Sequence, residues 1–329
     1  MACIPVAHSV PTAASIAAFV AAAYKFGPVG DCRFHTRGLN DTYALRAGTE
    51  RFVLRCYRRG WRSSADIEYE LAALLHLQRR GVPVSAPIVR RDGALVGHLD
   101  CPEGRRAVVL FTHGDRKELE GVDESRRYGQ ALARIHNATD DFRCAAARFR
   151  LDLDHLLNTP LTVILPRLVD RPADHKYLLA LADRLRGELR RRAPNLSTGF
   201  CHGDASGNAH IANDTVTFFD FDCCGEGWRS DELSIFIYGQ ALVGRPDAAE
   251  HCAAFLNGYQ MQRAILPGDR QTIPLFVLLR QIWHVGLHIA GADSCWGHGW
   301  INDAYLDHRF GNLRRWEESQ MTDLLPQTG

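Results

Sequence analysis

The sequence predicts an α+β fold, in which an antiparallel five-stranded lobe with one main helix precedes a mostly helical lobe. The first ~110 residues alternate between apolar and polar side chains, with turn residues between the runs, as strands do. From Tyr128 onward the apolar residues follow helical spacing. Because 329 residues suffice for two lobes, we place them at 1–111 and 112–329.

The first lobe is expected to open with a surface helix. Apolar residues from Ile16 to Ala23 keep helical spacing, and Thr12 is placed to cap that helix. A longer helix is expected over residues 65–80, where Gly81 ends it. Strands are expected at 32–36, 42–47, 51–57, 86–89 and 106–111.

The second lobe is expected to be helical from Tyr128–His136 to its end, with one exception. Between Phe200 and Phe221, short apolar runs bracket polar loops. The run Val216–Phe219 reads as a buried strand that would deliver Asp220 rigidly to the site. We find no internal repeat.

The charge of the chain is unevenly distributed, although its net charge is only +1. Residues 200–329 hold 8 Lys/Arg and 16 Asp/Glu, a net charge of −8, which leaves +9 on residues 1–199. A basic first part suits a polyanion such as a nucleotide, and an acidic second part suits metal or a cationic partner. The alternative is that both are solvated faces without a target. We expect neither nucleic acid nor membrane as a partner.

The cysteines and the N-terminal segment favour a cytoplasmic protein. Ten cysteines are scattered without a C-x-x-C pair, so neither a disulfide framework nor a zinc site is expected. The first 24 residues hold no Lys, Arg, Asp or Glu, but they lack a basic region, and Pro5 and Pro11 interrupt them, unlike a signal peptide. We find no apolar run long enough to span a membrane.

The strongest chemical signal is Cys201-His-Gly-Asp-Ala-Ser-Gly-Asn208, followed by Phe218-Phe-Asp-Phe-Asp222. Phosphoryl transfer requires a carboxylate to accept the hydroxyl proton of the substrate, and oxygen ligands to hold Mg²⁺ on the phosphates. Asp204, Asn208 and Asp220 supply those groups within 17 positions. Taken alone, each motif has a structural alternative. Asp204 and Asn208 would be turn residues, and Asp220 would cap a strand.

These two motifs resemble the aminoglycoside phosphotransferase and choline kinase superfamily, and the chain looks closest to its stress-response Ser/Thr kinase and homoserine-kinase-like members. Further markers of the resemblance are Leu39-Asn-Asp-Thr-Tyr43, Phe52-Val-Leu-Arg-Cys-Tyr-Arg58, Ile67-Glu-Tyr-Glu-Leu71, Gly81-Val-Pro-Val84, Leu132-Ala-Arg-Ile-His136 and Gly225-Glu-Gly-Trp-Arg229. The resemblance implies a protein-kinase-like fold that uses ATP and Mg²⁺. It also implies that Asp204 is the catalytic base and that Asn208 and Asp220 are metal ligands.

The resemblance also places nucleotide contacts in the first lobe. The turn from Gly38 to Thr42 lies where the family covers the phosphates, so Asn40 or Thr42 is a candidate contact; a plain hairpin turn is the alternative. Leu110 to Thr112 are expected to form the hinge, where backbone groups would bind adenine.

Arg55 stands where the family usually has a phosphate-binding lysine, and a planar guanidinium replaces a point ammonium there. Its expected partner is a helix carboxylate. Glu70 is the better candidate by motif position, and Glu68 is the neighbour to exclude. The alternative is that Arg55 is an exposed strand residue that does not bind phosphate.

Two further features depart from the family pattern. The loop between Asp204 and Asn208 is one residue shorter than in the family pattern. Its length decides whether Asn208 stays in register as a metal ligand. The family has an aspartate directly before this leucine, but here Glu232 precedes Leu233. Asp231 is therefore the residue expected to take the place of that aspartate. His202 is expected to brace the loop rather than act as a base.

The acceptor is expected to be a small hydroxyl-bearing molecule, with a cationic amine favoured. Aromatic faces and carboxylates attract such a group, and Trp and His are dense between Trp283 and Trp300. An anionic acceptor would instead need an arginine, Arg229 or Arg280. The candidate acceptor residues are Asp222, Arg229, Trp283, Asp293 and Trp296.

Two other functions remain open from the sequence. A Ser/Thr protein kinase of the stress-response type would share most of these markers. The departures at Arg55, the loop and Glu232 also fit a non-catalytic pseudokinase. The retention of Asp204, Asn208 and Asp220 together favours an active enzyme. Oligomeric state cannot be read from the sequence.

Overall fold

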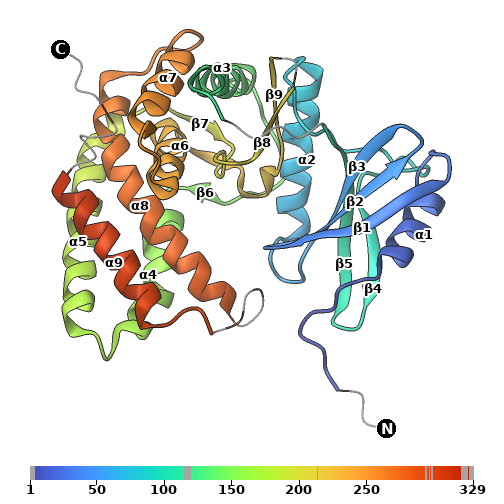
Figure 1. Cartoon of the computed structure of the whole chain (residues 1–329), viewed down its shortest axis with the longest axis horizontal. Coiled ribbons are helices and arrows are strands. Elements are labelled where there is room, and N and C mark those ends of the chain that lie inside the picture. The colour runs from blue at the N-terminus through green and yellow to red at the C-terminus, as the bar shows by residue number, and fades with distance from the viewer. Residues whose placement is uncertain are drawn as a thin grey trace. The chain divides into compact units, whose positions relative to one another are not determined.

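The computed structural model describes residues 4–114, 120–212, 214–292, 295, 297, 299–319 and 325. The chain divides into two compact units (Figure 1). Unit 1 holds residues 1–115, 144–147 and 293–297, and unit 2 holds residues 116–143, 148–292 and 298–329. Strands of an antiparallel sheet in unit 1 and a largely helical unit 2 confirm the predicted α+β class.

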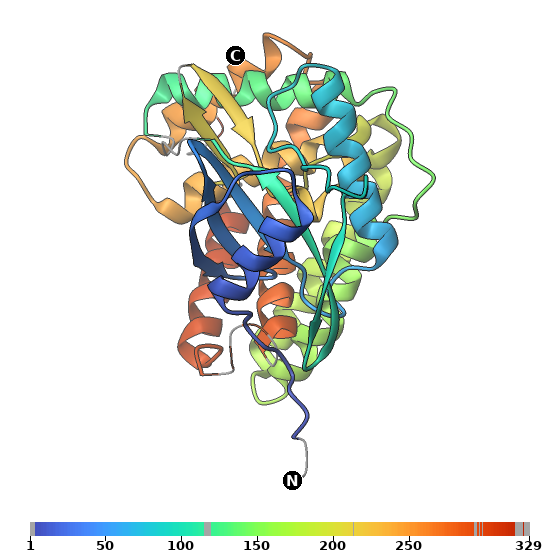
Figure 2. The same ribbon diagram turned by 90° about the vertical axis from the view of Figure 1, so that its right-hand side faces the viewer.

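The core of unit 1 is a five-stranded antiparallel sheet with the strand order β1-β2-β3-β5-β4. Figure 2 looks onto this sheet and onto the short helix α1 that packs against it. The strands are β1 (Val29–Arg37), β2 (Asp41–Ala47), β3 (Glu50–Cys56), β4 (Gly97–Cys101) and β5 (Gly104–Thr112). The helices of this unit are α1 (Ala13–Ala23) and α2 (Ser64–Arg79).

Both helices of unit 1 begin at polar caps. The Thr12 side chain accepts a hydrogen bond from the Ser15 N–H at 3.2 Å, so the predicted cap of α1 is confirmed. α2 begins after Ser63, which exchanges capping bonds with Asp66. Ile16 on α1 is buried in the same core as residues from β2 and β3, which explains why a short helix is stable there.

The position of the fourth strand was predicted wrongly. Residues 86–89 form only an isolated bridge between Pro87 and Phe111, and the strand next to β5 is instead Gly97–Cys101. Pro87 has no N–H to donate to a ladder, which limits the pairing of its segment. Two backbone bonds flank the bridge: the Ile88 N–H donates to the Leu110 carbonyl at 2.8 Å, and the Thr112 N–H donates to the Ala86 carbonyl at 2.9 Å.

Unit 2 consists of helices around three short strands and one hairpin. The helices are α3 (Val122–Ala138), α4 (Thr159–Ile164), α5 (Pro172–Arg192), α6 (Arg229–Val243), α7 (Ala248–Gln260), α8 (Pro267–Gly291) and α9 (Asp303–Ser319). Shorter helical turns are η1 (Asp154–Asn158), η2 (Leu165–Leu168), η3 (Ala193–Asn195) and η4 (Phe221–Cys223). The small sheet is ordered β6 (Arg150–Leu151), β10 (Gly225–Trp228), β7 (Thr198–Cys201), and β8 (Ala209–Ala212) pairs with β9 (Thr215–Phe218).

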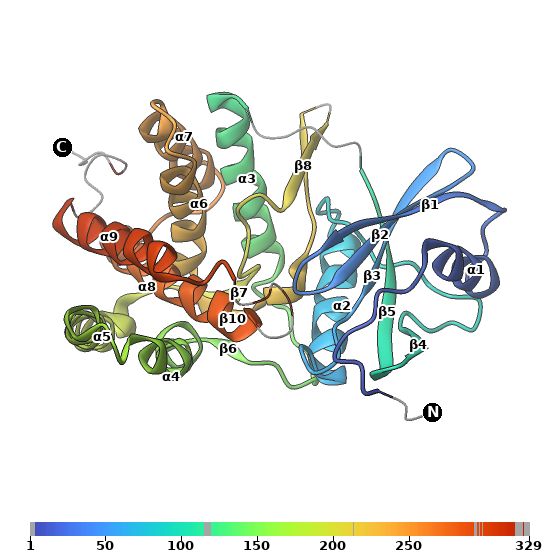
Figure 3. The same ribbon diagram turned by 60° about the horizontal axis from the view of Figure 1, so that its bottom comes forward.

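Helix α8 is the central helix of unit 2. It contacts α6, α4 and α9 (Figure 3). Among the described residues it is the one helix long and apolar enough to cross a membrane, although 67% of its most apolar window is buried inside the fold. Asp269, Arg270 and Arg280 lie among the apolar residues of this helix. Its apolar surface is used by packing, as in a core helix.

Candidate active site

The loop after β7 carries the first of the two sequence motifs. Gly203 in this loop has φ +78°, and a Cβ there would lie 2.2 Å from the Cys223 carbonyl oxygen. Only glycine allows this approach without a shift of backbone. The close approach therefore fixes the loop against the turn η4, which begins within the second motif and ends at Cys223.

Asp204 and Asn208 lie at the two ends of this loop and contact each other. The Asn208 amide nitrogen donates to the Asp204 backbone carbonyl at 2.8 Å and to its carboxylate Oδ2 at 3.3 Å. The carbonyl of Asn208 in turn accepts the Phe219 N–H at 3.0 Å. The shortened loop thus still places Asn208 beside both Asp204 and the residue that precedes Asp220.

Asp220 lies two residues after the end of β9, in a left-handed backbone conformation with φ 61° and ψ 57°. Asp and Asn tolerate this conformation better than other non-glycine residues. Such a backbone costs energy, and it is found where a side chain must be aimed. Asp220 lies close enough to Asp204 to raise the pKa of that carboxyl group, in addition to the larger effect of burial.

Asn208 and Asp220 fit a magnesium ion by the chemistry of their donors. The amide nitrogen of Asn208 is turned toward Asp204, so its amide oxygen is the atom left to bind a cation. Asp220 contributes carboxylate oxygens. Mg²⁺ takes hard oxygen ligands and is commonly held by one or two protein groups together with waters and phosphates.

Two residues apart on a strand, Asp220 and Asp222 would share a face, but Asp222 does not lie on a strand. The strand ends at Phe218, and Asp222 lies within the turn η4, where its side chain is 3% exposed. Its backbone carbonyl accepts a hydrogen bond from Arg148 at 2.5 Å. The left-handed residue Asp220 breaks the alternation of side chains that a strand would have imposed.

Asp204 forms an ion pair with Arg280 of α8. The guanidinium also donates from Nη1 to the Gly203 carbonyl at 2.9 Å, and it lies 4.2 Å from the centre of the Trp283 ring. Arg280 is 2% exposed, whereas the Asp204 side chain is 36% exposed. Burial raises the pKa of Asp204, and Arg280 opposes this effect by favouring the charged carboxylate.

Glu232, not Asp231, holds the loop that carries Asp204. Its carboxylate accepts hydrogen bonds from the backbone N–H groups of His202 and Gly203. The expectation that Asp231 would shift into this role is therefore corrected: the longer side chain of Glu232 reaches the loop from the first turn of α6. Asp231 is buried nearby, and burial raises its pKa to about 7, while Arg280 opposes that rise.

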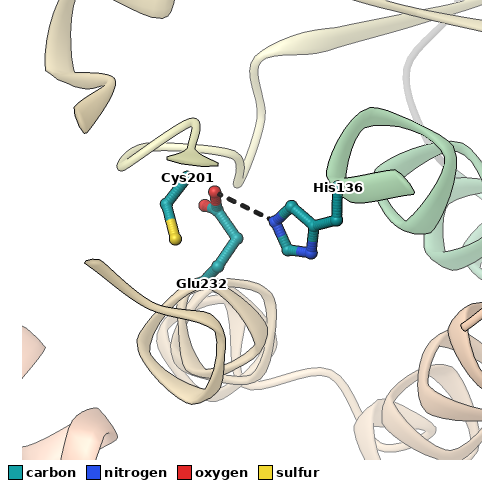
Figure 4. Close-up of side chains that lie close together, drawn as sticks. All are labelled: His136, Cys201 and Glu232. Atoms are coloured by element: carbon teal, nitrogen blue, oxygen red, sulfur yellow. Dashed lines mark ion pairs between the residues drawn. The ribbon is translucent and has the colours of Figure 1, made fainter. Parts of the chain in front are cut away.

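Glu232 also belongs to a buried cluster with His136 and Cys201 (Figure 4). These three side chains have the donor types of a metal site, but two observations indicate that they support the loop instead. Glu232 already accepts the two loop N–H groups, and burial raises the pKa of the Cys201 thiol well above its usual range, whereas a metal binds the thiolate. His136 lies 3.8 Å from Glu232 and exchanges a 2.7 Å hydrogen bond with the Tyr259 hydroxyl.

His202 has the bracing contacts expected of it. Its Nε2 lies 2.8 Å from the Phe219 carbonyl oxygen, and its Nδ1 accepts the Asp204 N–H at 3.3 Å. The ring therefore connects the two motifs through backbone atoms. Both of its nitrogens are engaged within unit 2, which leaves neither of them for a substrate proton.

In unit 1, Arg55 and Glu70 form the expected ion pair. Arg55 Nη1 lies 2.6 Å from Glu70 Oε1, and both side chains are buried. The structure adds Tyr57, whose hydroxyl donates to Glu70 at 2.8 Å and accepts from Arg55 at 3.1 Å. Sequence reasoning missed Tyr57, although residues two positions apart on a strand share a face, which was the available signal.

Asn40 and Thr42 flank a turn that is held from within unit 1. The Asn40 side-chain oxygen accepts the Arg58 N–H at 3.2 Å, and the Arg58 guanidinium donates to the Gly38 carbonyl at 3.0 Å. Thr42 donates from its hydroxyl to the Thr36 carbonyl at 3.4 Å. Asn40 is buried, and a phosphate contact by Asn40 or Thr42 stays a prediction.

The predicted hinge residues Leu110 and Thr112 bond the neighbouring segment of unit 1. The Leu110 carbonyl accepts the Ile88 N–H, and the Thr112 N–H donates to Ala86, whose own N–H donates to the Thr112 hydroxyl at 3.0 Å. These backbone groups hold residues 86–88 against β5. The contact of Leu110 to Thr112 with adenine stays a prediction.

Two of the candidate acceptor residues, Arg229 and Trp283, make hydrogen bonds within unit 2. Arg229 is buried and donates to Thr198 and, at 2.7 Å, to Asp140, which makes it part of the fold. Trp283 is buried as well, and its indole N–H donates to His155 at 3.2 Å. Asp293 and Trp296 lie outside the described residues.

Comparison with known proteins agrees with this geometry. The model of the phosphotransferase enzyme family matches residues 32–270. An uncharacterized protein of Deinococcus radiodurans is 38% identical over 321 residues, which cover 95% of this chain and 92% of that protein. The amicoumacin kinase of Bacillus subtilis is 26% identical over 289 residues, 83% of each chain. The homoserine kinase of Rhodopseudomonas palustris is 29% identical over 261 residues, which cover 77% of this chain and 76% of that one.

Solved structures show the same fold. An amicoumacin kinase in complex with AMP-PNP, Ca²⁺ and Ami superposes with a TM-score of 0.75 at 20% identity, covering 96% of this chain and 95% of that chain. A microcompartment-associated aminopropanol kinase gives a TM-score of 0.74 at 23% identity, covering 96% and 100%. These likenesses confirm the kinase-like architecture predicted from the sequence.

Proposed function

Because this chain belongs to the phosphotransferase enzyme family, we propose that it transfers the γ-phosphoryl group of ATP to a hydroxyl group of a small molecule. The observation that carries the proposal is the grouping of Asp204, Asn208 and Asp220 around one loop of unit 2. This grouping matches what phosphoryl transfer requires: a proton acceptor for the hydroxyl and oxygen ligands for a divalent cation.

Asp204 is the proposed base. Its Oδ2 accepts the proton of the acceptor hydroxyl while the hydroxyl oxygen bonds to the γ-phosphorus and the bond to the ADP oxygen breaks. Asn208 and Asp220 are the proposed ligands of Mg²⁺, which supplies positive charge to the phosphates when it is bound. Arg55, held by Glu70 and Tyr57, is the proposed cation for the phosphates in unit 1.

The acceptor is proposed to be a small hydroxyl compound that carries an amine. The names of similar proteins favour this class, since amicoumacin kinase, homoserine kinase and aminopropanol kinase all act on small molecules. The excess of 16 acidic over 8 basic residues after residue 200 also suits a cation. A cationic acceptor should lose kcat/KM as salt rises, whereas a neutral one should not.

The experiment is a nucleotide-consumption screen of the purified protein with ATP and Mg²⁺. Amino alcohols, aminoglycosides, homoserine and generic protein substrates form the panel, and Asp204→Asn protein is the blank for each. Consumption above the blank with an amino alcohol or antibiotic supports the proposal. Phosphorylation of proteins alone would replace it with the stress-kinase function, and nucleotide binding without any consumption would indicate a pseudokinase.

A further inference from the structure

We propose that Arg280 is a positioning residue for the reaction, which orients the carboxylate of Asp204 so that Oδ2 faces the acceptor hydroxyl. The inference rests on the proposed function. Arg280 pairs with Oδ1 of Asp204, and Asn208 contacts Oδ2 at 3.3 Å. A base must present one oxygen at a fixed angle to the proton that it takes, and Arg280 occupies the other oxygen.

Arg280 is itself held in place from three sides. Its Nη1 donates to the carbonyl of Gly203, the residue before Asp204. The Trp283 ring packs against its guanidinium at 4.2 Å, and Arg280 is 2% exposed. A rigid guanidinium fork that bonds both the backbone and the side chain of one loop fixes the rotation of the carboxylate.

The same contacts argue against Arg280 as the anchor of an anionic acceptor. Both terminal nitrogens are used on Gly203 and Asp204, and Nε is buried without a hydrogen-bond partner among the described residues. An acceptor carboxylate would have to displace Asp204 to reach this guanidinium. Such a displacement would remove the base from its place and leave a buried charge with a changed partner, which is costly.

Arg280 differs from the other ionisable groups around Asp204 by its permanent positive charge. Asp220 and Glu232 are acidic neighbours of Asp204, and the His202 ring bonds backbone groups. The hydroxyls of Tyr128 and Tyr238 also lie close enough to interact electrostatically with Asp204. Among the described residues, Arg280 is the one arginine or lysine that forms an ion pair with Asp204. No other permanent cation in this set holds the carboxylate.

The test compares Arg280→Lys, Arg280→Gln and Arg280→Ala with wild type in steady-state kinetics. We expect Arg280→Gln to lower kcat by about 10²-fold, as a small misplacement of a reacting group does, with the KM of nucleotide and acceptor nearly unchanged. Arg280→Lys should recover part of this loss, and added guanidinium should restore turnover to Arg280→Ala. Arg309→Gln is the matched control, because Arg309 is a buried arginine of α9 that contacts Tyr238 rather than Asp204.

A double-mutant cycle separates this inference from the proposed function. If Arg280 acts through Asp204, then Arg280→Gln should cause no further loss of residual transfer in an Asp204→Asn background. An Asp204→Asn protein with full turnover would overturn the proposed function. An inactive Asp204→Asn protein together with a fully active Arg280→Gln protein would overturn the role of Arg280 alone. Equal losses in Arg280→Gln and Arg309→Gln would do the same, since they would indicate a general effect on packing.

Discussion

Glu232 in the first turn of α6 accepts a hydrogen bond from the backbone N–H of His202, thirty residues earlier in the chain. The N–H of Gly203 donates to the same carboxylate. Burial by itself would raise the pKa of Glu232, but the contact with His136 and these loop bonds outweigh it and lower the pKa. A charged carboxylate therefore holds the loop that carries Asp204.

Replacing Glu232 should destabilise the protein and slow the reaction. Glu232→Asp shortens the side chain, and Glu232→Gln removes the charge from bonds to two buried N–H groups, so we expect losses of about 1–3 kcal/mol in the free energy of unfolding. Denaturant unfolding measures this quantity. Glu226→Gln is the control, because Glu226 pairs with Arg150 on the surface and should change stability by less than about 1 kcal/mol. Equal stability of the Glu232 and Glu226 variants would contradict the bracing role.

Asp204→Asn should abolish transfer without altering the fold. Loss of a general base typically costs ~10²–10⁴-fold in rate. Asn keeps the shape of the side chain, so the contacts with Asn208 and Arg280 can partly persist and nucleotide binding should remain. Single-turnover transfer and nucleotide affinity are the two measurements. A variant that retains more than about half of the wild-type rate would exclude Asp204 as the base.

Asp220→Asn should weaken Mg²⁺-dependent nucleotide binding. Asn is preferred over Ala as the test because residue 220 has φ 61°, which Asn tolerates and Ala does not. The variant thus removes the charge with little backbone strain. Asn208→Ala should weaken the same binding, with a smaller effect because a neutral ligand is lost. Titration of Mg²⁺ against nucleotide affinity tests both; an unchanged Mg²⁺ dependence in Asp220→Asn would rule out Asp220 as a ligand.

Arg55→Ala should raise the KM for nucleotide and lower kcat, whereas Arg55→Lys should be partly active. Lysine keeps the charge, but a point ammonium cannot reproduce the bonds of one guanidinium to Glu70 and Tyr57. Arg55→Ala and Glu70→Ala should be non-additive in a double-mutant cycle, with a coupling of about 0.5–3 kcal/mol. Arg51→Ala is the control on the same strand. Full additivity would mean that the Arg55–Glu70 pair has no role in binding.

Asp231→Asn should stabilise the protein at neutral pH. The folded-state pKa of Asp231 is raised to about 7, above its ordinary value near 3.8, so the folded protein retains a proton that the unfolded chain has lost. Wild type therefore loses stability from this group as pH rises from about 4 to 7. The advantage of Asp231→Asn should grow over that range to on the order of a few kcal/mol. Thermal unfolding at pH 5 and pH 8 is the measurement, and an equal difference at both values would contradict it.

The local patterns of the sequence determined the fold class and the positions of the chemistry. Helical spacing and the Thr12 cap predicted α1, and strand alternation predicted β1, β2, β3 and β5 within a few residues. The order Asp204, Asn208, Asp220 identified the candidate base and metal ligands, because these motifs depend on short spacing that a sequence displays directly. The pairing of Arg55 with Glu70 followed from their motif positions.

Tertiary structure alone decided which side chains serve those motifs. The contact between Arg280 and Asp204 joins residues 76 positions apart, and the choice of Glu232 over Asp231 depends on which side chain of α6 reaches the loop. The position of β4 depended on where residues 86–88 lie along β5. Each of these outcomes is a long-range packing event: many partners are compatible with the local sequence, and burial together with hydrogen-bond geometry selects one of them.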